Sequence, residues 1–167
     1  MDLSLFPLLA IHAHYLQDPR GAHIALEDGI TGFVDAGSAG ADNIDDIVAM
    51  ARAAPQPARI LINIGRRGVI GEGDTFELSL ANVEACKAAI ASNLDYVVGV
   101  KARLTAEVTA NDREVLRRAQ EAASYFKLPV MIHMGQSETP MGELVKLLKP
   151  GDIVVHDSPP TTHATVH

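Results

Sequence analysis

Five ionisable side chains follow apolar runs of the sequence, at points where strands would end. His12 and His14 close the run LLAIHAH, Lys101 follows YVVGV, His133 follows PVMI, and His156 follows GDIVV. In parallel β/α folds the side chains that do chemistry gather at the carboxyl ends of the strands. A single histidine after an apolar strand is usually a hydrogen-bonded structural residue. Several such coincidences in one short chain favour a shared site.

The spacing of His12 and His14 suits metal binding. Residues i and i+2 of an extended strand point to the same side, so both imidazoles would face one ion. Neutral imidazoles are good ligands for zinc. The pair is a weak signal alone, but with Lys101, His133 and His156 at later strand ends it predicts a metal centre, with zinc as the expected ion.

Lys101 has one structural and two functional interpretations. In the structural one, it is a lysine at a sheet edge that reaches solvent. A buried amine close to metal ions is held without its proton and becomes nucleophilic. Such an amine can take up carbon dioxide as a carbamate, whose two oxygens can bridge two metals about 3.5–4 Å apart. It can instead form a Schiff base with a carbonyl substrate. The neighbouring histidines favour the carbamate.

Two loops supply weaker candidates for substrate binding. Arg66 lies in the segment GRRG after the third apolar run, and its planar guanidinium suits a carboxylate. An exposed loop arginine is an equally good interpretation. Ser38 lies in the segment GSAG, which predicts a tight turn and close approach to substrate, and no lysine of a phosphate-binding loop follows it. His23 and Cys86 are interpreted as structural residues.

Short apolar strands alternate with helical segments along the chain, which predicts an α/β fold with a parallel sheet. Several strands are continuously apolar, as expected when both faces of a sheet are covered. Asp42 is the expected N-cap of the first long helix. The expected strands are 8–12, 32–35, 59–63, 96–101, 129–133 and 152–156, and the expected helices are about 43–54, 78–91, 111–126 and 141–148.

Composition restricts the class of protein. The chain has 167 residues with 14 basic and 21 acidic side chains, giving a net charge of −7. This balance disfavours nucleic-acid binding. The single cysteine, Cys86, excludes an internal disulfide framework. The apolar run 3–11 is too short to span a bilayer and has no basic flank, so we expect a cytoplasmic protein with no membrane partner.

The order HxH, Lys, His, His on successive strands resembles the amidohydrolase superfamily, and more narrowly its deacetylase-type metallohydrolases, relatives of dihydroorotase. The segments VDAGSAGADN (34–43), GVKARL (99–104), MIHMG (131–135) and GDIVVH (151–156) carry the resemblance, which covers residues 8–157. The family fold is a (β/α)8 TIM-type barrel with a small β-sandwich.

The resemblance implies a binuclear zinc site. His12 and His14 would hold the more buried metal, His133 and His156 the second, and Lys101 would bridge them as a carboxylated lysine. The implied reaction is hydrolysis of an amide or ester bond in a small molecule through a metal-bound hydroxide. The family's proton-shuttling aspartate at the end of strand eight has no counterpart here.

The chain length conflicts with a complete barrel, which needs about 250 residues. We expect an incomplete hydrolase barrel of six β/α units over 1–157, without the β-sandwich, and an irregular tail over 158–167. Six strands cannot close a barrel staggered for eight, so the sheet should be an open arc. Its unpaired edges predict homo-oligomerisation or self-association.

Two further functions compete with the hydrolase. The first is a non-catalytic, metal-binding remnant, which the missing strands favour and which a metal analysis beside a hydrolysis assay would separate from an enzyme. The second is a Schiff-base aldolase or lyase that uses Lys101, which borohydride trapping would reveal; it leaves the histidines without a role.

Overall fold

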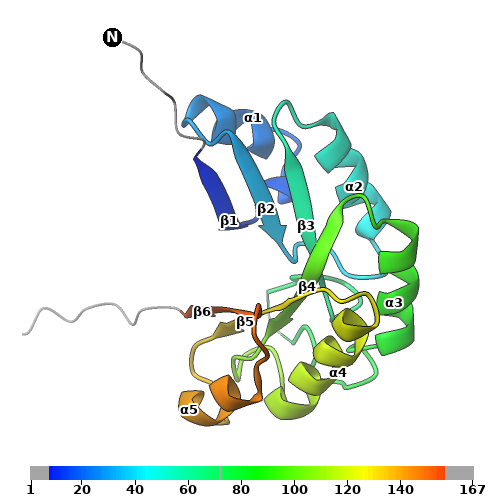
Figure 1. Ribbon diagram of the computed structural model, residues 1–167, viewed down its shortest axis with the longest axis vertical. Coiled ribbons are helices and arrows are strands. Elements are labelled where there is room, and N and C mark those ends of the chain that lie inside the picture. The colour runs from blue at the N-terminus through cyan, green and yellow to red at the C-terminus, as the bar shows by residue number, and fades with distance from the viewer. Residues whose placement is uncertain (1–7, 72, 157–167) are drawn as a thin grey trace, which may run out of the picture.

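The computed structural model describes residues 8–71 and 73–156, and six parallel strands alternate with helices along them (Figure 1). The predicted α/β class and all six predicted strands are confirmed, with strand ends displaced by two residues at most. The strands are β1 (Leu9–Ala13), β2 (Gly32–Ala36), β3 (Ala58–Asn63), β4 (Val97–Arg103), β5 (Val130–Met134) and β6 (Ile153–His156). The α-helices are α1 (Gly21–Glu27), α2 (Ile44–Ala53), α3 (Val83–Ser92), α4 (Asp112–Tyr125) and α5 (Met141–Leu144), with 3-10 turns η1 (Tyr15–Gln17) and η2 (Val145–Leu147).

The strands lie in the sheet in the order in which they occur in the sequence, from β1 to β6. Figure 1 shows the sheet curving as an arc, with α2, α3 and α4 along its outer side. Within the described part of the chain β1 pairs with β2 alone and β6 with β5 alone. The fold is therefore a partial TIM-type barrel with two open edges, as the chain length predicts.

Side chains alternate between the two faces of the arc, because successive residues of a strand point in opposite directions. On the outer face, Ile60 and Ile62 of β3 pack with Leu116 of α4 in a core whose members are almost wholly buried. On the inner face, Leu61 packs with Met131 in a much smaller cluster. The helices therefore cover the outer face well, and the inner face keeps room for polar side chains.

The helix starts differ from expectation in two places. The N-cap of α2 is Asn43, so the prediction of Asp42 was wrong. The Asn43 side chain accepts a hydrogen bond from the Gly40 amide, while Asp42 turns to Arg66. Helix α3 begins at Val83, five residues later than expected, because the side chain of Asn82 accepts from the Ala85 amide and caps it there.

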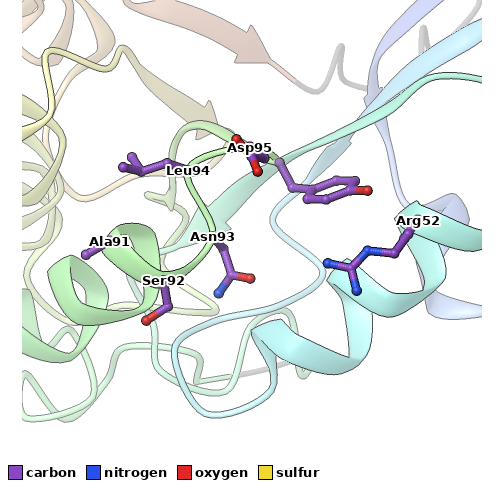
Figure 2. A pocket seen from close by; sticks show the side chains of 7 residues that line it. Arg52, Ala91, Ser92, Asn93, Leu94 and Asp95 are labelled. Carbon is purple, nitrogen blue, oxygen red and sulfur yellow. The ribbon is translucent and has the colours of Figure 1, made fainter.

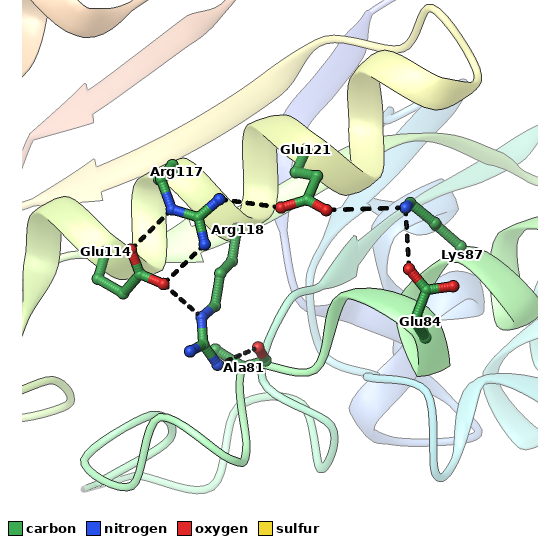
Figure 3. Close-up of polar contacts among 7 residues, drawn as sticks. All are labelled: Ala81, Glu84, Lys87, Glu114, Arg117, Arg118 and Glu121. Carbon is green, nitrogen blue, oxygen red and sulfur yellow. Dashed lines mark hydrogen bonds and ion pairs between the residues drawn. The ribbon is translucent and has the colours of Figure 1, made fainter.

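Charged side chains join α3 to α4 on the outer surface (Figure 3). Glu114 accepts from Arg117 and Arg118 at 2.7 and 2.8 Å. Lys87 of α3 lies 3.0 Å from Glu84 and 3.9 Å from Glu121 of α4. Exposed pairs contribute about 0–1 kcal/mol each, so this network supports the helix packing without dominating it.

Apolar side chains remain exposed along both edge strands. Leu9 and Ile11 of β1 are 58% and 48% exposed, and Val154 of β6 is 43% exposed. An edge strand offers unpaired backbone groups, and exposed apolar side chains beside them favour pairing with another chain. No helix in the described ranges is both long and apolar enough to cross a membrane.

Candidate functional site

Three imidazoles meet on the inner face at the carboxyl ends of the strands. The rings of His12 and His14 have centroids 5.9 Å apart, and the ring of His12 lies 5.5 Å from that of His133. His12 belongs to β1 and His133 to β5, so the curvature of the sheet brings these distant strands face to face. His12 lies in β1 and His14 directly follows it, and the ring of His12 contacts both other imidazoles.

Lys101 lies within β4 and not at its end, because the strand continues for two residues to Arg103. The predicted strand end at Lys101 was therefore wrong. The side chain is nevertheless fully buried, and its Nζ lies 3.4 Å from Sδ of Met131 on the inner face. The neighbouring strands place Asn63 and Met131 beside Lys101 in register. An amine in this position is shielded from water.

Gly37 allows the backbone of the loop after β2 to approach Lys101. Its φ is +91°, which disfavours other residues. A Cβ at Gly37 would lie 2.7 Å from Cγ of Lys101. The glycine is therefore needed both for the turn and for the space that the lysine stem occupies.

A buried carboxylate supports His14 through a hydroxyl. Asp35 accepts hydrogen bonds from the amide and the hydroxyl of Ser38, both at 2.9 Å, and Ser38 Oγ lies 2.8 Å from Nδ1 of His14. Burial raises the pKa of Asp35, and the bonds from Ser38 oppose that rise. Burial also lowers the pKa of His14, helped by the positive charge of Lys101 and opposed by Asp35. A lowered pKa keeps this imidazole neutral, as a metal ligand must be.

Arg103 and Asp74 form a second polar contact at the same end of the sheet. Arg103 Nη1 donates to Asp74 Oδ2 at 2.9 Å, and the Asp74 side chain is almost wholly buried. The loop that carries Asp74 also binds the loop after β4, since the Gly73 amide donates to the carbonyl of Glu107 at 3.0 Å. Arg103 is in register with His133, so a fixed guanidinium lies at the edge of the site.

Sequence reasoning missed three of these polar residues. Arg103 stands two positions after Lys101 on the same strand, and Asn63 is the first polar residue after the apolar run of β3, so both had a detectable signal. Asn63 is buried, and its Oδ1 accepts from the Gly65 amide at 2.8 Å. Asp74 had no signal, because its partner Arg103 is distant in the sequence.

The other predicted site residues are placed as follows. Ser38 is buried against His14 and Asp35, and Arg66 is exposed and bonded to Asp42 at 2.6 Å. The backbone of His156 is in register with Met134, and its side chain lies outside the described residues, as does the segment 158–167. Across the described ranges, no three His, Cys, Asp or Glu side chains are grouped as a metal site. The five-residue site therefore stays a prediction.

A separate pocket of about 190 Å³ lies at the opposite ends of the strands (Figure 2). Residues 91–96, which precede β4, line it together with Arg52 of α2. The guanidinium carbons of Arg52 and Arg59 lie 5.6 and 5.9 Å from the ring centre of Tyr96, within the range of cation–π contacts. This end of a β/α sheet contributes stability more than chemistry.

Comparison with known proteins gives relatives over most of the chain, although no family model matches it. A deacetylase of Enterococcus faecalis is 29% identical over 137 residues, which cover 80% of this chain and 37% of the relative. A crystal structure of an adenine deaminase superposes with a TM-score of 0.81 at 27% identity, over 88% of this chain and 42% of that one. A dihydroorotase structure matches with a TM-score of 0.72 at 24% identity, over 75% of this chain and 36% of that one, which concerns the fold alone. The chain thus spans less than half of each.

Proposed function

We propose that this chain, a partial relative of the amidohydrolase-superfamily deacetylases, forms the metal-binding half of a hydrolase that cleaves an amide or ester bond of a small molecule. The observation that carries the proposal is the meeting of three imidazoles, from His12, His14 and His133, on the same face of the sheet as the buried Lys101 side chain. A site with these groups at the strand ends is where β/α folds carry out chemistry.

The donor set fits divalent metal ions of the zinc type. The lowered pKa of His14 keeps one imidazole neutral, and the ring of His12 lies 5.9 Å from it and 5.5 Å from that of His133. A carbamate formed on Lys101 would add two oxygen donors and a negative charge, which would offset the charge of two cations. His156 would complete the set from β6, whose backbone is in register with β5.

The residues of the chain have distinct roles in this scheme. His12, His14, His133 and His156 would hold the metals, and Lys101, carboxylated by carbon dioxide, would bridge them. A bound metal of this kind supplies a Lewis acid for the carbonyl and eases deprotonation of a water. Arg103, held by Asp74, places a fixed positive charge beside the site, where it would orient an anionic part of the substrate. Ser38 and Arg66 stay candidates for substrate contact.

A metal titration combined with a hydrolysis assay tests the proposal. The purified chain is loaded with zinc or cobalt in bicarbonate, its metal content is measured, and it is assayed on a panel of acetylated amides and esters. We expect up to two ions per chain, fewer in Lys101→Ala, and hydrolysis that depends on metal. A variant on the outer surface, Lys146→Ala, is the control for the loss of a lysine.

Each outcome assigns one of the functions. Metal binding without hydrolysis would favour a non-catalytic remnant. A covalent adduct on Lys101 after borohydride reduction in the presence of a carbonyl substrate would favour Schiff-base chemistry. Unchanged metal stoichiometry in Lys101→Ala would contradict the bridging carbamate.

A further inference from the structure

The hydroxyl of Ser38 lies between a buried carboxylate and an imidazole of the candidate metal site. Ser38 Oγ is 2.9 Å from Oδ2 of Asp35 and 2.8 Å from Nδ1 of His14. Asp35 is fully buried and Ser38 nearly so. Asp35 of β2, Ser38 in the loop after it and His14 just after β1 thus form a short series of hydrogen bonds that ends on one nitrogen of His14.

The number of protons available fixes the donor and the acceptor in each of these hydrogen bonds. The amides of Ser38 and Leu16 donate to the two oxygens of Asp35, at 2.9 and 3.4 Å. Both oxygens therefore act as acceptors, as they do in an ionised carboxylate. The Ser38 hydroxyl has one proton, and its bond to Asp35 uses that proton. Its oxygen then accepts from His14, so the hydrogen of the neutral ring sits on Nδ1. The lone pair of the ring is left on Nε2.

We propose that Asp35 and Ser38 are positioning residues, which hold His14 as its Nδ1–H tautomer and so present Nε2 as the metal-binding nitrogen. The proposal rests on the metal site described under the proposed function. A metal-binding histidine is commonly oriented through its second nitrogen, because that bond fixes both the tautomer and the ring plane.

The backbone of this segment serves the same arrangement. Gly37 lies between the two positioning residues and adopts a φ of +91°, which lets the Ser38 amide turn back to Asp35. The same turn brings the loop against the stem of Lys101. The loop after β2 therefore supports two of the proposed metal ligands at once, His14 and Lys101, without being a ligand itself.

The chain contains a matched control for the loss of a buried hydroxyl. Thr139 donates to Asp112 through both its amide and its hydroxyl, each at 2.7 Å, and both residues are buried. This pair repeats the contact between Ser38 and Asp35. Thr139→Ala removes the same kind of bond, so it separates a general loss of stability from a specific effect on His14.

The decisive variant is Asp35→Asn, which keeps the size of the side chain and reverses one hydrogen bond. Asparagine can donate to Ser38 Oγ through Nδ2, and the hydroxyl then donates to Nδ1 of His14. The imidazole would carry its hydrogen on Nε2, away from the orientation that binds metal. Ser38→Ala removes the bond altogether and frees the tautomer.

The experiment measures the tautomer of His14 in the metal-free protein by 15N NMR, and zinc affinity by competition with a chromophoric chelator. We expect Nδ1–H in the wild type and in Thr139→Ala, and a shift toward Nε2–H in Asp35→Asn. Zinc affinity should fall about 10- to 100-fold in Asp35→Asn and Ser38→Ala and stay unchanged in Thr139→Ala.

The outcomes separate this inference from the proposed function. A wild type that carries Nε2–H on His14 overturns the inference, whether or not the variants fold. An unchanged tautomer with zinc affinity equal to that of Thr139→Ala also overturns it, while the metal site stands. A tautomer that switches in Asp35→Asn in a protein that binds no zinc supports the positioning role and removes the proposed function.

Discussion

Replacing Gly37 with alanine tests the close approach between the loop after β2 and Lys101. The φ of +91° alone makes a Cβ unfavourable, by about 1–2 kcal/mol. That Cβ would also lie 2.7 and 2.8 Å from Cγ and Cβ of Lys101. Cβ is fixed by the backbone, so a rotation of the lysine side chain cannot relieve both contacts, and overpacking adds about 1–3 kcal/mol. We expect Gly37→Ala to lower the free energy of unfolding by about 2–5 kcal/mol.

Gly29 provides the matched control for this variant. Its φ is +87°, nearly that of Gly37, and no atom lies within 4 Å of the position that a Cβ would take. Gly29→Ala should therefore lose only the backbone contribution, about 1–2 kcal/mol. Urea unfolding followed by far-UV circular dichroism gives both values. Equal losses in the two variants would refute the contact between the loop and the lysine.

Three other properties follow from burial, charge and the open edges. Burial raises the pKa of the Cys86 thiol to about 12, so it should react with a disulfide reagent at pH 8 far more slowly in the native protein than in urea. Two arginines of α4 lower the pKa of Glu114 from 4.5 to about 2, so its stabilising contribution is present above pH 4.5 and is lost as the pH falls toward 2. The free energy of unfolding in urea should therefore fall less between pH 5 and pH 2.5 in Glu114→Gln than in the wild type. The control Glu138→Gln, on a loop, should behave as the wild type. A charge on the edge strand should oppose self-association, so Ile11→Lys should sediment with a larger monomer fraction than Ile24→Lys on α1, and equal fractions would contradict association through the sheet edge.

The sheet could be predicted from the sequence because its central strands are buried on both faces and therefore form continuous apolar runs. The segment ILIN of β3 is an example, where Ile60 and Ile62 enter the outer core and Leu61 the inner one. Helix α1 was not predicted, because its sequence GAHIALE is short and has no acidic first turn or cap side chain. Its stability depends on packing, since Ala22 joins the outer core.

The sequence reveals the candidate ligands but not the residues that hold them in place. His12, His14 and His133 follow apolar runs, a pattern that one strand reveals by itself. The end of β4 was misplaced because Ala102 is buried and Arg103 is held by Asp74, a contact that the sequence does not show. The hydrogen bond between His14 and Ser38 likewise joins residues 24 positions apart. Such partners depend on how the sheet curves, which no local pattern encodes.

The sequential order of the strands bears on how the chain folds. Every pairing joins strands that are neighbours along the sequence, and the widest separation, between Leu61 and Gly99 (99 − 61), is 38 residues. The entropy cost of closing a loop grows only as the logarithm of its length. Each strand pairing therefore has a similar cost and does not require the others to form first. A closed barrel would also have to bring its first strand to its last, across nearly the whole chain. This arc has no such strand pairing among the strands described, and we expect its sheet to form by adding one unit to the next.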